Sequence, residues 1–74
     1  MMSLQDKLYN WLTIKVVVDA RPEDTAANDT KVMFERLLLE EHGISHPVVT
    51  KDEIMYFINI ERNGEPKTYR FPRD

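Results

Sequence analysis

Apolar residues recur with helical spacing between residues 24 and 42, and this is the most regular pattern in the chain. Pro22 ends the element that precedes it, because the residue before a proline avoids the helical region, and Pro22 or Asp24 then opens this segment. Gly43 ends it as a residue able to take the left-handed conformation, and Ile44 is placed to fold back. The apolar positions of this predicted helix, with Thr30 filling the gap between them, are Ala26, Ala27, Met33, Phe34, Leu37 and Leu38.

The N-terminal segment has a helix start at Ser3, whose hydroxyl can accept a hydrogen bond from the backbone N–H of Asp6. Residues 13–19 then fit two predictions. Lys15 interrupts the apolar helical face and three consecutive valines favour a strand, whereas no turn signal separates this stretch from the helix before it. One continuous helix is favoured, with Lys15 laying its stem along the apolar face, and the strand stays open as the alternative. The helical face before the ambiguous stretch consists of Leu4, Leu8, Trp11 and Leu12.

The last third of the chain alternates between apolar and polar residues, as strands do. Residues 48–50 predict a short strand, residues 51–53 a polar turn and residues 54–60 a longer strand. Asn63-Gly64 then predicts a two-residue hairpin. In that register Pro66 falls at a non-hydrogen-bonded position, so its missing N–H faces away from the partner strand and marks the third strand as an edge. The register pairs Ile60 with Lys67, Ile58 with Tyr69, and Tyr56 with Phe71.

These elements predict an α+β fold in which two N-terminal helices precede a three-stranded antiparallel meander, in the order α-α-β-β-β. Residues 1–74 are expected to form one small two-layer domain, because a chain this short supports a single core. A three-stranded sheet needs one covered face. We expect the second helix to cover the face that carries Tyr56, Ile58 and Phe71.

Four apolar residues are left over from this arrangement. Val32 and Leu39 lie nearly opposite the main apolar face of the second helix, and Met55 and Phe57 point away from the predicted core of the sheet. Contiguous exposed apolar residues mark interaction sites, so these four are the candidate interaction surface. The alternatives are that the first helix packs over Val32 and Leu39, or that the residues are scattered singly on the surface.

Composition indicates the cellular compartment and the kinds of structural support that we expect for this chain. The chain has no cysteine, which excludes disulfides and thiolate metal sites and fits a reducing compartment. It has no apolar run long enough to span a bilayer and no secretion signal at its start, so we expect a cytoplasmic protein without a membrane partner. A core this small is commonly supported by oligomerisation.

No constellation of residues predicts catalysis, a cofactor or a metal. His42 and His46 have the spacing of a helical zinc pair, but Gly43 breaks the helix between them. The acidic stretch around Pro22 lacks the glycine and the alternating ligands of a calcium loop. With only two glycines there is no phosphate-binding loop, and no serine or threonine has a nucleophile context.

The third strand and the tail carry a mixture of basic and aromatic residues that resembles a nucleic-acid surface. The alternation separates them, because Tyr69 and Phe71 point toward the predicted core while Arg70 points the other way. The net charge of −3 also disfavours phosphate binding. A nucleic-acid-associated protein that uses Arg70 and Arg73 is therefore the alternative to an interaction module.

Over about the first half of this chain, the stretches SLQDKLYNWLTIKVV and DTAANDTKVMFERLLLEEHGI resemble the start of short, uncharacterised cytosolic proteins from spore-forming Gram-positive bacteria. That resemblance implies a family without an assigned activity, and it transfers no site residues. The prediction from the residues is a non-catalytic protein–protein interaction or regulatory module, binding itself as a homodimer or higher oligomer, or binding another protein.

Overall fold

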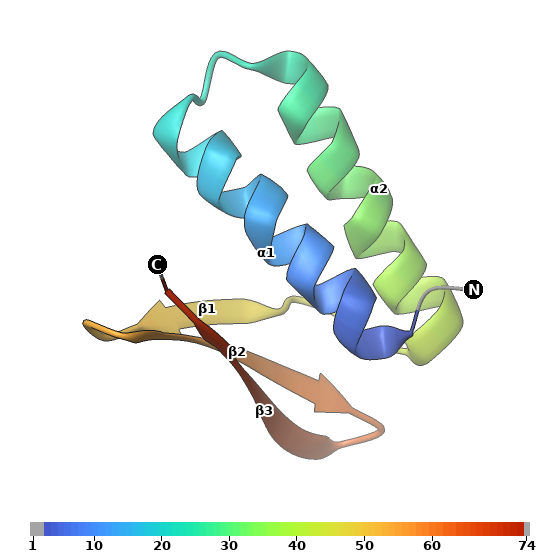
Figure 1. Cartoon of the computed structure of the whole chain (residues 1–74). Coiled ribbons are helices and arrows are strands. Elements are labelled where there is room, and N and C mark those ends of the chain that lie inside the picture. The colour runs from blue at the N-terminus through green and yellow to red at the C-terminus, as the bar shows by residue number, and fades with distance from the viewer. Residues whose placement is uncertain (1–2, 74) are drawn as a thin grey trace.

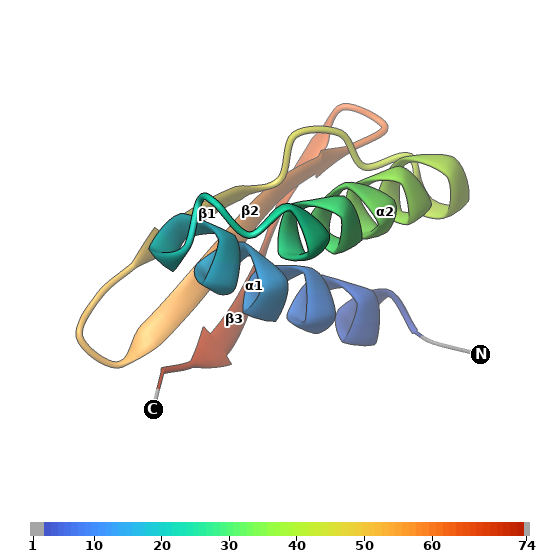
Figure 2. The same cartoon turned by 90° about the horizontal axis from the view of Figure 1, so that it is seen from above.

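A computed structural model describes residues 3–73, in which two helices are followed by a three-stranded antiparallel sheet (Figure 1). The helices lie side by side on one face of the sheet, and the view from above shows both crossing over the strands (Figure 2). The predicted α+β fold of order α-α-β-β-β is therefore confirmed. The elements are α1 (Leu4–Ala20), α2 (Thr25–His42), β1 (Val48–Lys51), β2 (Met55–Arg62) and β3 (Glu65–Pro72).

Helix α1 continues through residues 13–19, so the helical alternative for this stretch is correct and the strand is wrong. The Ser3 hydroxyl accepts a hydrogen bond from the Asp6 N–H at 3.1 Å, as predicted for the N-cap. The Lys15 ammonium reaches Asp19 one turn later, at 3.0 Å. Helix α1 packs against α2, and this tertiary contact overrides the weak local preference of the three valines for strand, although Val16 and Val17 themselves stay exposed.

Helix α2 begins and ends at the residues that the sequence indicates. The carboxylate of Asp24 accepts from the Ala27 N–H at 3.0 Å, and Gly43 follows the last turn with a φ of 68°. The N–H of Ile44 returns to the Leu38 carbonyl at 3.1 Å, so Ile44 folds back under the helix and is buried. This C-terminal turn fixes the path of the chain toward β1.

The hairpin register matches the prediction at every pair that the sequence specified. Ile60 lies opposite Lys67, Ile58 opposite Tyr69, and Tyr56 opposite Phe71. Asn63 and Gly64 both have positive φ, at 53° and 79°, as the two-residue turn requires. Where the chain turns between β1 and β2, one carboxylate oxygen of Asp52 accepts from the N–H groups of Ile54 and Met55, each at 2.8 Å.

The two edges of the described sheet differ in the hydrogen-bond donors that they present outward. The Arg73 N–H bonds to the Ile54 carbonyl, so alternation along β3 turns residues 66, 68, 70 and 72 away from β2. Two of these four, Pro66 and Pro72, have no N–H to offer. The Asp52 N–H bonds to the Met55 carbonyl, so the same alternation turns Val49 and Lys51 of β1 outward with both donors present.

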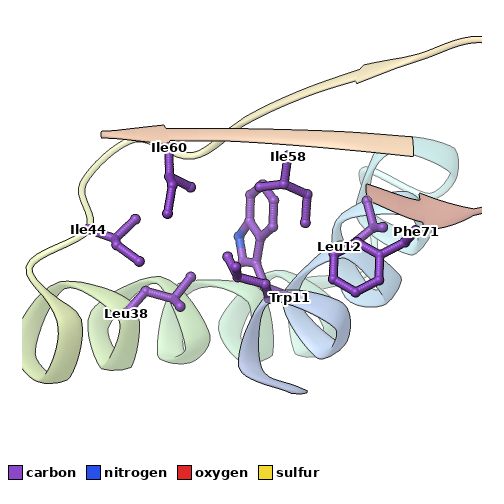
Figure 3. Close-up of a cluster of buried hydrophobic side chains, with 8 residues drawn as sticks. Trp11, Leu12, Leu38, Ile44, Ile58, Ile60 and Phe71 are labelled. Atoms are coloured by element: carbon purple, nitrogen blue, oxygen red, sulfur yellow. The ribbon is translucent and has the colours of Figure 1, made fainter. Parts of the chain in front are cut away.

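The core lies between the inner face of the sheet and the helices, and α1 supplies most of its helical part. Figure 3 shows Trp11 of α1 standing between the helices and Ile58 of β2. Helix α2 contributes Leu38 to the buried cluster. The sequence predicted α2 as the helix that covers the face with Tyr56, Ile58 and Phe71, but α1 supplies more of the buried side chains that pack on this face. The buried cluster consists of Leu8, Trp11, Leu12, Leu38, Ile44, Ile58, Ile60 and Phe71.

Two positions predicted for the apolar face of α2 are on the surface. Met33 is 50% exposed and Ala26 is also exposed, whereas Ala27 and Leu38 are buried. The buried stripe of α2 is rotated toward α1, so that the stem of Lys31 and the ring of Phe34 lie partly buried along it. The rotation follows from α1, rather than the sheet, being the main partner of α2.

Candidate interaction surface

An apolar groove runs between the outer side of α2 and residues 44–48, and it contains two of the four predicted surface residues. Val32 is 44% exposed and Leu39 is 54% exposed. Val48 closes the groove from the sheet side and is 55% exposed, with Ile44 and Pro47 between. The groove has a volume of about 560 Å³. The alternative in which α1 packs over Val32 and Leu39 is wrong, because α1 lies against the other side of α2 (Figure 2).

The groove exists because the chain turns back along α2 immediately after the helix ends. Gly43 takes the left-handed conformation, and His46 takes it again with a φ of 53° directly before Pro47. A side chain in this region is uncommon and costs roughly 1 kcal/mol, more so before a proline. The kink interrupts the regular pairing between the Ile44–Arg62 bridge and the first pair of β1, Val48 with Asn59. Residues 44–48 therefore stand beside α2 as the second wall.

Met55 and Phe57 lie on a different surface, the face of the sheet away from the helices. Both are half-buried, and Phe57 has Thr50 and Arg70 as its cross-strand neighbours. Next to it the Asn59 amide accepts from the Thr68 hydroxyl at 2.8 Å and donates to Thr50 at 3.4 Å. This polar row is typical of a solvated face. The structure thus brings Val32 and Leu39 together but does not join Met55 and Phe57 to them.

A second groove, missed by the sequence reasoning, lies between α1 and the end of the sheet where β3 finishes. Its apolar wall is formed by Tyr9, Val16 and Val17, each more than one third exposed, and its volume is about 490 Å³. Figure 1 shows that α1 rises away from the sheet toward the loop that joins it to α2, which opens this side. The available signal was that α1 carries apolar residues on every side, which is unusual for a surface helix.

Charged residues border the α2 groove, and two of them are free to meet a partner. Arg36 and Glu40 are exposed, and neither makes an ion pair within residues 3–73. Glu35 is already engaged, because it accepts from the indole N–H of the buried Trp11 at 3.0 Å and from the Lys31 ammonium at 3.1 Å. The unpaired Arg36 and Glu40 lie on one flank of the Val32–Leu39 stripe, given the helical period of 3.6 residues.

A buried lysine links the first turns of α1 to the last turn of α2. Lys7 is 5% exposed, and its ammonium donates to Glu41 and to Nε2 of His42, the latter at 3.0 Å. The hydrogen bond from Lys7 lowers the pKa of Glu41. Burial, together with the positive charges of Lys7 and Arg62, lowers the pKa of His42, which favours the neutral ring that accepts from Lys7.

The histidines and the aromatic residues of β3 that the sequence offered as candidates do not come together in one site among the described residues. His42 is engaged with Lys7, His46 lies in the wall of the α2 groove, and residues 3–73 hold no group of three or more potential metal ligands. On β3, Phe71 is buried and its ring lies 5.6 Å from that of Tyr9. The Arg73 guanidinium stacks over Tyr56 at 5.3 Å.

No helix of the described chain is both long and apolar enough to cross a membrane.

Comparison with known proteins gives no match to a family model, to a curated protein or to a solved structure. The resemblance to short proteins of spore-forming bacteria therefore stays a prediction.

Proposed function

We propose that this protein is a small non-catalytic protein–protein interaction module of the cytoplasm, which binds a second copy of itself or another protein through the α2 groove. The observation that carries the proposal is the exposure of Val32, Leu39 and Val48 around one hollow. Isolated apolar side chains on a surface need no explanation, but three that share a groove present a contiguous patch, and such patches mark interaction sites.

The size of the molecule supports the same proposal. The buried cluster consists of eight side chains, and α1 leaves further apolar residues in solvent at Tyr9, Val16 and Val17. A domain of 74 residues buries only about 60% of the surface of its unfolded chain, so additional burial against a partner stabilises it. A partner that covers the α2 groove supplies that burial without any change of fold.

The test is purification of the tagged chain from native cytosol, followed by native mass measurement and identification of bound proteins. We expect an assembly heavier than the 8.8 kDa chain, formed with itself or another protein. Leu39→Glu and Val32→Glu should release it because they place a charge in the groove. Met33→Glu is the matched control, since Met33 is equally exposed but lies outside the groove. A strict monomer, or equal behaviour of all three variants, would contradict the proposal.

A nucleic-acid-associated protein is the second candidate, and one observation favours it. Phe57 and Arg70 are cross-strand neighbours on the outer face of the sheet, so an aromatic ring and a cation share one accessible surface. An electrophoretic mobility assay with single-stranded RNA and DNA tests it. Retardation at low salt that is lost in Arg70→Glu would support this function, and no retardation at the lowest salt would exclude it.

A further inference from the structure

We infer that the occupant of the α2 groove is a second copy of this chain, held by antiparallel pairing of α2 with α2 about a two-fold axis beside Leu39. This inference rests on the proposed function and specifies its partner and geometry. Three features of α2 support it: the apolar stripe, the two unpaired charges that flank this stripe, and the position of the groove relative to the end of the helix.

The first step is the direction in which the apolar stripe faces. Val32 and Leu39 are seven residues apart, almost two full turns, so they form one line on α2 with Arg36 beside it. All three are exposed, whereas Ala27 and Leu38 face the interior. An exposed line of this spacing is the geometry with which one helix packs on another.

The second step is charge complementarity, which decides between helix directions and fixes the register. In an antiparallel pair related by a two-fold axis, each flank of one helix meets the same flank of the other. Arg36 and Glu40 lie on one flank, four residues apart, on either side of Leu38. An axis at that level sets Arg36 of each copy opposite Glu40 of the other, which gives two reciprocal ion pairs. It also brings the two Leu39 side chains together at the centre.

The third step is the use of the groove itself. In the same register Val32 of one copy falls opposite the end of α2 in the other, where Ile44, Pro47 and Val48 form the wall. Each chain therefore places its Val32 against the wall of the partner's groove, and the partner's Val32 packs against the wall of its own groove. The left-handed turns at Gly43 and His46 hold that wall in place before the copies meet.

The size of this contact sets the expected affinity. The apolar contribution comes from three half-exposed side chains in each copy, which places the interface at the small end of specific complexes, below roughly 1,200 Å² in total. We therefore expect a reversible dimer with a dissociation constant on the order of micromolar, sensitive to salt through the two ion pairs.

Charge reversal with mixing tests the register. Arg36→Glu and Glu40→Arg should each weaken the homodimer at least tenfold in sedimentation equilibrium, because like charges then face each other across the axis. An equimolar mixture of the two variants should form a heterodimer close to wild-type affinity, since both cross-pairs become Glu with Arg. Each variant keeps its own repulsion within the helix, so recovery on mixing can come only from contacts between chains.

Cysteine cross-linking tests the axis, because the chain has no natural cysteine to interfere. Leu39→Cys should form a disulfide-linked dimer under mild oxidation, whereas Met33→Cys, at equal exposure, should not. A wild-type chain that stays monomeric up to millimolar concentration but captures another protein through Leu39 would overturn this inference and leave the proposed function standing. A dimer without recovery on mixing and without the Leu39→Cys cross-link would overturn the α2 register alone.

Discussion

Leu38 and Leu39 are neighbours in α2 with opposite surroundings, and truncating each to alanine should have very different effects. Leu38 is fully buried among the core side chains, whereas Leu39 is more than half exposed in the groove. Removing a buried leucine side chain loses its transfer free energy and leaves a cavity, which costs about 3 kcal/mol. At Leu39 the cavity is absent and part of the side chain is already in water, so the cost should stay below about 1 kcal/mol.

The magnitude is large compared with the stability that such a domain has to lose. At roughly 0.05–0.15 kcal/mol per residue, a chain of 74 residues has a free energy of unfolding of about 4–11 kcal/mol. A small protein has an m-value of about 1 kcal/mol/M in urea, so Leu38→Ala should lower the unfolding midpoint by about 3 M. At the lower end of the range, Leu38→Ala would be partly unfolded without any denaturant.

The assay can use the natural fluorescence of the chain. Trp11 is its only tryptophan and lies 1% exposed in the cluster that contains Leu38, so its emission reports directly on loss of the core. Urea titrations at submicromolar protein concentration keep self-association from adding to the measured stability. Equal shifts in the two variants, or a loss below about 1 kcal/mol in Leu38→Ala, would refute the burial of Leu38 and the exposure of Leu39 on α2.

Three further predictions concern the contact between His42 and Lys7, the C-terminal cap of α2 and the turn between β1 and β2. The pKa of His42 lies below its ordinary value of 6.5, so below about pH 6.5 the unfolded chain binds more protons than the folded chain, and the free energy of unfolding should drop there. His42→Gln keeps an acceptor for Lys7, so it should flatten this drop between pH 5 and 7.5 in urea titrations. Gly43→Ala should cost about 1 kcal/mol from its φ of 68° alone, since an added Cβ meets nothing within 4 Å, and thermal unfolding that matches wild type would contradict that left-handed cap. Asp52→Ala should lower the melting temperature more than Asp52→Asn, because asparagine retains an acceptor for Ile54 and Met55; equal melting temperatures would show that the carboxylate bonds do not hold the turn.

The sequence was sufficient wherever a local rule decides the structure. The hairpin register follows from Asn63-Gly64, whose positive φ values match the turn, and from Pro66, whose nitrogen points outward. The boundaries of α2 follow from Asp24 and Gly43 for the same reason. These features depend on residues within six positions of each other, so no distant part of the chain has to be known.

The sequence was insufficient where one element chooses between two partners. Helix α1 carries apolar residues on every side, so periodicity cannot say which side meets the sheet, and the larger share of α1 in the core could not be predicted. Met33 was predicted to be buried because its spacing from Leu37 fits a helical stripe. The buried face of α2 is instead the one that meets α1, and Met33 lies outside it.

The candidate surface was predicted in part for the same reasons. Val32 and Leu39 were identified correctly as exposed because they lie off the main stripe of α2. Their groove was not predictable, since its wall depends on the positive φ of His46, a backbone conformation that is uncommon for any residue other than glycine. Met55 and Phe57 face outward as expected, but the distance of that face from α2 is a property of the assembled layers.

The unequal edges of the sheet have a consequence for crowded solutions. Fibres grow when every chain can accept a neighbour on two sides, and β3 is interrupted on its open side by Pro66 and Pro72. Only β1 keeps a complete row of outward donors, at Val49 and Lys51. If two β1 strands from different molecules join, the shared sheet ends after two chains, because both of its outer edges are then β3 strands, and a continuous stack of strands cannot extend from them.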